Sequence, residues 1–144
     1  MALFTVGLDT GRSPSEAWQR LVDWPEHGRY VPLTAVRVAT ASPEGLGTVF
    51  VARTGVGRFT FDDPMEITEW QPPMTGRAGR CRVEKRGRVL SGWAVLTVTP
   101  RGTGAHVSWQ EEIRVARLPR LADPVIVASS RRVFGRVLRQ LLAV

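Results

Sequence analysis

The C-terminal stretch PVIVASSRRVFGRVLRQLLAV, residues 124–144, decides the fold of this chain. One apolar stripe recurs in it at helical spacing, made of Val127, Ser130, Phe134, Val137, Leu138 and Leu141. Most of the charge falls off this stripe, on Arg131, Arg132, Arg136 and Arg139. The pattern predicts one long amphipathic helix, which must bury its stripe against another element.

The large partner available to this helix is the segment of about seventy residues before it, which alternates with a period of two from Thr34 onward. Glycine and proline clusters divide that segment into six antiparallel strands. We expect a hairpin turn at 55–57 and a bulge near Asp63 and Pro64.

The N-terminal part is predicted to hold one strand and two short helices. Residues 3–8 form a short apolar strand. Ser13 then suits a helix cap and Pro14 the first helical position, and a second short helix covers 26–30. The predicted order is strand, two helices, six strands and one long helix. This is an α+β fold in which a curved antiparallel sheet of about seven strands wraps around the C-terminal helix.

Length and composition indicate a single domain over 1–144, with a hydrophobic fraction of 43% and a charged fraction of 23%. No segment is predicted to be a signal peptide or a membrane span. The single cysteine, Cys81, excludes an internal disulfide framework, so we expect a cytoplasmic protein. Cys81 also lacks the ligand spacing of a metal site, so neither a metal nor another cofactor is expected.

The net charge of +7 is mostly arginine, because Lys85 is the only lysine. Basic residues crowd 77–88 and 114–120. Two interpretations stay open. The arginines form a surface that binds an anionic membrane, RNA or the ribosome, or they are solvent-exposed side chains at the edges of the sheet with no partner. No aromatic residues interleave with the cluster at 77–88, as a single-strand nucleic-acid surface requires, so nucleic acid is the less favoured partner.

The layout resembles the helix-grip fold of the START and polyketide-cyclase (SRPBCC) superfamily over nearly the whole chain. The local similarity lies in the helix opening SPSEAW at 13–18, in DDPMEITEWQPP at 62–73, in GWA at 92–94 and in VSWQEE at 107–112. The superfamily includes lipid carriers, coenzyme Q-binding proteins, plant hormone receptors and polyketide aromatase/cyclases. It has no universal catalytic signature, so the resemblance implies a fold and a ligand cavity but no particular site residue.

An apolar pocket is expected between the curved sheet and the long helix. Strand parity and the helical stripe predict its walls as Val51, Phe59, Phe61, Met65, Trp93, Trp109, Phe134, Val137, Leu138 and Leu141. Trp93 is placed beside Trp109 because a short loop at 100–104 pairs their strands. These walls suit an apolar lipid-, isoprenoid- or polyketide-like molecule.

Glu111 falls on the inward parity with Trp109 and Ile113. An inward carboxylate is costly unless it is paired or protonated. It is therefore either a general base or ligand anchor with a raised pKa, or half of a structural ion pair. Arg53 either faces inward as the partner, by its parity, or sits at a strand end and reaches water, whereas Lys85 adjoins a turn and is expected to reach water.

His27 and Tyr30 lie in the second short helix, at the mouth where ligands enter in this superfamily. A histidine there could shuttle protons and a tyrosine could donate to a carbonyl, or both could be solvated surface residues.

The sequence is compatible with three functions. The first is binding, transport or sensing of an apolar molecule. The second is a polyketide cyclase, aromatase or dehydratase in which Glu111 is the base and Arg53 or Tyr30 stabilises the oxyanion, and the third is an interaction module that uses the arginine-rich face.

Overall fold

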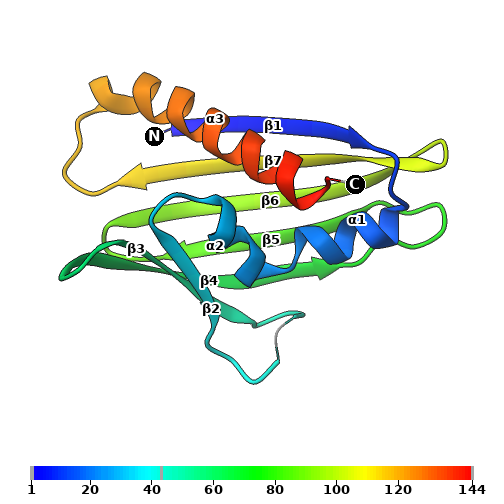
Figure 1. Cartoon of the computed structure of the whole chain (residues 1–144), viewed down its shortest axis with the longest axis horizontal. Coiled ribbons are helices and arrows are strands. Elements are labelled where there is room, and N and C mark those ends of the chain that lie inside the picture. Colours follow the sequence, from blue (N-terminus) through cyan, green and yellow to red (C-terminus); the bar gives the residue numbers. More distant parts are fainter. Residues whose placement is uncertain (1, 43, 144) are drawn as a thin grey trace.

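The computed structural model describes residues 2–42 and 44–143 and confirms the α+β helix-grip architecture. The elements, in chain order, are β1 (Ala2–Thr10), α1 (Pro14–Leu21), α2 (Trp24–Tyr30), β2 (Thr34–Val38), β3 (Val49–Val56), β4 (Phe59–Gln71), β5 (Gly79–Arg86), β6 (Leu90–Arg101), β7 (Gly104–Val115), the 3-10 turn η1 (Arg120–Ala122) and α3 (Asp123–Leu141). Figure 1 shows α3 lying across the sheet with α1 and α2 beside it. No helix in the described ranges combines the length and the apolar character needed to cross a membrane.

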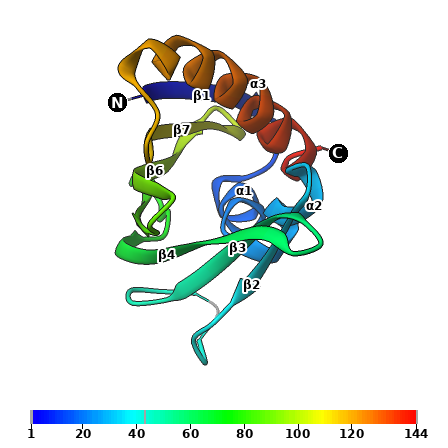
Figure 2. The ribbon, with the colours of Figure 1, turned by 90° about the vertical axis from the view of Figure 1, so that its left-hand side faces the viewer.

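The strands form one antiparallel sheet in the order β1-β7-β6-β5-β4-β3-β2. Because adjacent strands twist relative to one another, a sheet of this size curls. Figure 2 shows the curl, with the sheet bending from β1 round to β2 and the helices on its concave side. The two ends of the sheet therefore approach the same helix layer, and the inward residues of distant strands face one interior.

Local sequence explains how the first helix begins. Ser13 adopts an extended conformation and its side chain accepts a hydrogen bond from the Glu16 backbone N–H at 3.2 Å, while Pro14 occupies the first turn. A hydroxyl at this position satisfies one of the free N–H groups at a helix start. The predicted cap is confirmed.

The predicted bulge near Asp63 and Pro64 is wrong. Pairing of β3 with β4 runs without interruption from Val49–Glu66 to Val56–Phe59, and the register shifts farther along β4, between Ile67 and Glu69. Pro64 lies where β4 borders β3 but has not yet begun to pair with β5. A proline that has a single strand neighbour does not force the strand to bulge.

Packing divides the concave space into two halves. At one end α1 and the last turns of α3 fill it with almost fully buried side chains, which include Leu21, Val98, Val107, Val137, Leu138 and Leu141. These residues form a solid core. At the other end, beneath the first turns of α3, the sheet and the helices stay apart.

Candidate functional site

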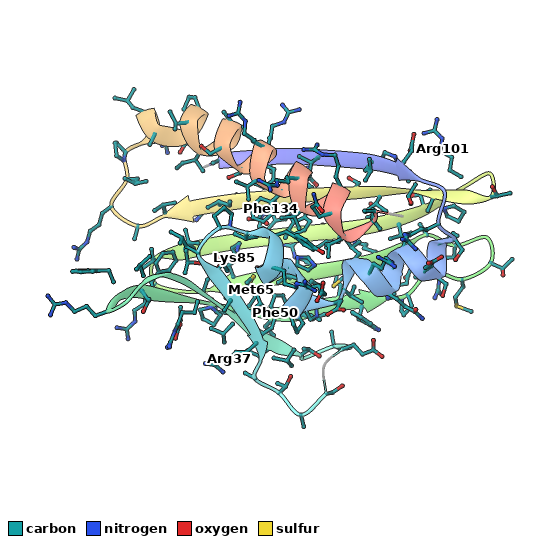
Figure 3. All side chains as sticks on the ribbon, in the orientation of Figure 1. Arg37, Phe50, Met65, Lys85, Arg101 and Phe134 are labelled. Atoms are coloured by element: carbon teal, nitrogen blue, oxygen red, sulfur yellow. The ribbon has the colours of Figure 1, made fainter. Side chains whose placement is uncertain are left out.

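A cavity of about 340 Å³ occupies the second half of the concave space. Its floor is the inner face of β3 to β7, and α2 and the first half of α3 cover it. Of the predicted walls, the structure brings together Phe61, Met65, Trp109 and Phe134. Figure 3 shows Phe50, Met65, Lys85 and Phe134 converging on the interior, whereas Arg37 and Arg101 lie at the periphery.

Ring contacts join five side chains in one continuous row along the cavity. The Trp24 ring of α2 stacks on Phe50 of β3 with 4.3 Å between ring centroids. The His27 ring lies 5.3 Å from the rings of both Trp24 and Trp109, and Trp109 lies 4.8 Å from Phe134 of α3. Such rings supply a large, rigid contact area for an apolar or flat molecule.

Three ionisable side chains meet inside this apolar cavity. The Lys85 Nζ atom lies 2.8 Å from Asp63 Oδ2 and 3.9 Å from Glu111 Oε2. The side chains of Lys85, Asp63 and Glu111 are 7%, 6% and 2% exposed, so water screens them little. Glu111 Oε1 also accepts a hydrogen bond from the indole N–H of Trp109 at 2.9 Å. We call Asp63, Lys85 and Glu111 the buried charge cluster.

Small residues on β6 let this cluster form. Lys85 is on β5 and Glu111 on β7, and β6 runs between them. Strands two places apart are about 10 Å apart, so a contact must pass over the strand between them. The β6 residues at this level are Gly92, paired with Lys85, and Ala94, paired with Glu111. A Cβ at Gly92 would lie 1.9 Å from the Glu112 backbone oxygen, so Gly92 permits the close approach of β7. The small side chain of Ala94 leaves a path across β6 for the lysine side chain.

Charge and burial pull in opposite directions in the cluster. Burial would lower the pKa of Lys85, but Glu111 and Asp63 outweigh it and raise that pKa above its usual value, so the ammonium stays charged. Burial raises the pKa of Glu111, and Lys85 and the Trp109 N–H only partly oppose that rise. One ammonium thus serves two carboxylates, and the raised pKa of Glu111 makes it easier to protonate than an exposed glutamate.

Three buried polar atoms of the described residues have no hydrogen-bond partner: Glu111 Oε2, Asp63 Oδ1 and the Trp24 indole nitrogen. All three belong to residues that line the cavity. A buried polar atom without a partner costs about 1–3 kcal/mol. Three of the residues that line the cavity therefore each carry a polar atom that no described group satisfies. The described part of the chain holds no group of three or more His, Cys, Asp or Glu side chains placed to hold a metal ion.

His27 lines the cavity, but its side chain is buried in the wall rather than exposed at a mouth. Its Nε2–H donates to the Leu21 carbonyl at 2.7 Å, and burial lowers its pKa to about 4. The ring is therefore neutral near pH 7, with its lone pair on Nδ1. Tyr30 lines a separate, shallower hollow on the surface together with Arg53.

Of the two orientations that the sequence left open for Arg53, the structure shows the outward one. Its guanidinium is 62% exposed and bonds Asp62 on the outer surface at 2.9 Å. The inward residues of β3 are Phe50, Ala52 and Thr54. Val51 alternates with these and shares the outer face with Arg53, so the prediction of Val51 as a pocket wall is wrong.

The other predicted walls lie outside the cavity for different reasons. Trp93 pairs with Glu112 rather than Trp109, and on the outer face its N–H donates to Glu112 at 3.0 Å while Arg82 covers its ring. Phe59 is 78% exposed at the β3–β4 turn. Val137, Leu138 and Leu141 belong to the solid core that fills the other half of the concave space.

Much of the basic cluster at 77–88 is neutralised on the outer face of the sheet. Three of its arginines form ion pairs across or along strands, Arg80 with Glu69, Arg82 with Glu84 and Arg86 with Glu66. Its lysine points inward to the buried charge cluster. This stretch is therefore less cationic than its sequence indicates.

Comparisons with known proteins agree with this architecture. The protein TTHA0849 from Thermus thermophilus is 13% identical, with a TM-score of 0.76 over 96% of this chain and 93% of that one. A STAR-related lipid transfer protein from Xanthomonas axonopodis is 16% identical, with a TM-score of 0.70 over 95% and 84%. A Thalictrum norcoclaurine synthase point mutant is 14% identical, with a TM-score of 0.61 over 97% and 93%. At these identities the likeness shows the fold alone.

Sequence comparison adds the family. No curated protein matches the chain. The model of the family described as "Polyketide cyclase / dehydrase and lipid transport" matches residues 1–144, which is the whole chain. The chain therefore belongs to the polyketide cyclase/dehydrase and lipid transport family.

Proposed function

We propose that this protein binds a hydrophobic small molecule, lipid-, isoprenoid- or polyketide-like, and carries or senses it. The observation that supports the proposal most is the cavity of about 340 Å³, with its aromatic and aliphatic walls. Ligand cavities for small molecules are mostly of about 300–1,000 Å³, apolar, and furnished with a few placed polar groups. The family and the fold are consistent with a ligand of this kind.

The unpartnered atoms indicate what the polar end of the ligand carries. A ligand hydroxyl that reached Asp63 Oδ1 or Glu111 Oε2 would donate to it, and a ligand oxygen that reached the Trp24 N–H would accept from it. Each such bond removes a desolvation cost that the empty cavity bears. The proposed ligand therefore has an apolar body and at least one hydroxyl group.

Native mass spectrometry of the purified protein tests for a bound molecule, and a neutral dye, N-phenyl-1-naphthylamine, tests the cavity directly. We expect the dye to become fluorescent with the wild-type protein. Ser129→Trp adds bulk at an exposed helical position that lines the cavity, and Ala52→Phe does so from β3, so both should abolish the signal. Trp93→Phe, on the outer face, is the matched control and should keep it.

Two results would overturn the proposal. One is equal dye binding by wild type, Ser129→Trp and Ala52→Phe. The other is a wild-type protein that binds neither a copurified molecule nor the dye. Because Ser129 is exposed, its replacement should leave the fold intact, and circular dichroism checks this.

A second candidate is catalysis of a cyclisation or dehydration on a polyketide-like substrate. The buried Glu111 favours it, because a carboxylate with a raised pKa is a stronger base near neutral pH. The oxyanion role expected of Arg53 or Tyr30 falls instead to Lys85, which lines the cavity. Glu111→Gln should then bind the dye as wild type does but turn over no poly-β-ketone substrate. Unchanged turnover by this variant would eliminate Glu111 as the base.

A further inference from the structure

The cavity reaches the surface at one end of the molecule. Of its lining residues, Pro32 and Ser129 are exposed, one on the α2–β2 connection and the other on α3. The β3–β4 turn, the β5–β6 turn and the β7–α3 connection lie at this same end, at the left of Figure 1 and facing the viewer in Figure 2. We call the segments 31–33, 55–61, 86–90 and 115–126 the open end.

Exposed apolar side chains are concentrated at the open end. Seven of the ten large apolar residues that the described structure leaves exposed belong to it: Leu33, Val56, Phe59, Val89, Leu118, Leu121 and Val125. Leu121 is 90% exposed and Phe59 is 78% exposed. They come from four separate segments, so they are not a single frayed loop. A gathering of this kind marks an interaction surface.

These exposed residues continue the cavity wall outward. Each segment of the open end places one apolar residue on the cavity wall next to, or two positions from, an exposed one: Pro32 beside Leu33, Phe61 near Phe59, Leu90 beside Val89, and Ile126 beside Val125. An apolar ligand that leaves the cavity here meets apolar surface rather than bare polar groups.

Unpaired positive charge surrounds the apolar residues. Arg58, Arg88, Arg117 and Arg120 are exposed on the same segments, and none of them forms an ion pair with another described residue. Arg58 lies over the Phe59 ring at 5.4 Å. The two described non-glycine residues with positive φ, Leu33 and Arg117, are also here, in a backbone conformation that costs free energy and is found mostly where surroundings or function require it.

We propose that the open end docks on an anionic lipid bilayer. Leu121 and Phe59 enter the interface between headgroups and acyl chains, and the four arginines contact lipid phosphates. Docking places the cavity mouth against the apolar layer, so a ligand passes between bilayer and cavity without crossing water. This last step rests on the proposed ligand-binding function, but docking itself does not.

Binding to vesicles tests the proposal on the whole chain. Leu121→Cys provides one reactive thiol for a polarity-sensitive fluorophore, because Cys81 is fully buried. We expect a blue shift with phosphatidylglycerol–phosphatidylcholine vesicles at low salt, a weaker one with phosphatidylcholine alone, and loss as salt rises. The same fluorophore on Leu46→Cys, exposed in the β2–β3 loop, should not shift.

Two matched double variants test whether binding depends on the arginines of the open end or only on the net charge of the protein. Removing one arginine near the surface should weaken binding about fivefold, so Arg88→Gln with Arg120→Gln should weaken it about thirtyfold. Arg77→Gln with Arg101→Gln removes the same charge from the β4–β5 loop and from the last residue of β6, at the opposite end of the molecule, and should change binding little (Figure 1). Phe59→Asp, at an exposed position, should also abolish the shift with the fold intact.

Three outcomes would overturn docking: no binding to the anionic vesicles at low salt, equal losses in the two double variants, or a dimer in sedimentation that Leu121→Asp dissociates while vesicles have no effect. Vesicle binding together with failure to bind the dye would sustain docking and overturn the proposed ligand-binding function.

Discussion

Replacing Lys85 by methionine should destabilise the protein far more than losing a surface ion pair does. Lys85 is the sole cation within 4 Å of Asp63 and Glu111 among the described residues, and all three side chains are less than one-tenth exposed. Removing one partner of a buried ionic group costs about 3–5 kcal/mol, because the remaining charge has no compensation. That is a large part of the roughly 5–15 kcal/mol that stabilises a domain of ordinary size.

Urea unfolding of Lys85→Met at pH 7 and pH 4 measures this cost. Lys85 lowers the pKa of Glu111, so without it that pKa rises further above the ordinary value of 4.5. A group whose pKa is raised in the folded state contributes stability below its unfolded pKa and loses it as pH rises through the folded pKa. The deficit relative to wild type should therefore be largest at pH 7 and smaller at pH 4.

Two further variants make the test specific. Arg80→Met breaks the half-exposed pair with Glu69 and should cause no measurable loss. Adding Asp63→Asn and Glu111→Gln to Lys85→Met removes both carboxylates and should recover much of the lost stability. A Lys85→Met protein that is no less stable than Arg80→Met, or whose deficit is the same at both pH values, would refute this prediction.

The remaining predictions concern His27, Cys81 and Trp93. The His27 ring should titrate near pH 4 by NMR, and the stability it contributes above pH 6.5 should be lost as pH falls toward 4; a midpoint near 6.5 would show an exposed ring. Burial raises the pKa of the Cys81 thiol to about 12, so a thiol reagent should label it only on unfolding, and rapid labelling in native buffer would contradict its burial. Trp93→Phe should cost about 1 kcal/mol through the lost bond to Glu112 and leave dye binding unchanged, whereas loss of binding would place Trp93 in the cavity.

The order of elements, the helix cap at Ser13 and the inward side chain of Glu111 could all be predicted, because each depends on neighbours along the chain. The alternation of apolar and polar residues predicted correctly which side chains of β7 face inward, because apolar residues occupy only one face of this strand. It failed on β3, where Val51 on the outer face and Phe50 on the inner face are both apolar and both buried. A strand with two apolar faces has no parity signal, so Arg53 could not be oriented from sequence.

The buried charge cluster was visible in part. Asp63 shares parity with Phe61 and Met65, and Lys85 with Val83, so the alternation that turns Glu111 inward turns both of them inward as well. What the sequence could not supply is the register that places three strands at one level. The position of Lys85 beside a turn predicted that its side chain would reach water, and this prediction is wrong. The lysine is buried because Asp63 on β4 and Glu111 on β7 compensate its charge, and these partners are distant in the sequence.

The cluster explains how a carboxylate is kept in an apolar cavity. One ammonium between two carboxylates leaves one negative charge, which either a proton on Glu111 or a donor group of a ligand can compensate. The small Ala94 on β6 allows Lys85 to reach across to Glu111, so a larger residue at this position should separate the two. The buried charge cluster is therefore not a closed ion pair, because two of its carboxylate oxygens, Glu111 Oε2 and Asp63 Oδ1, lack a hydrogen-bond partner.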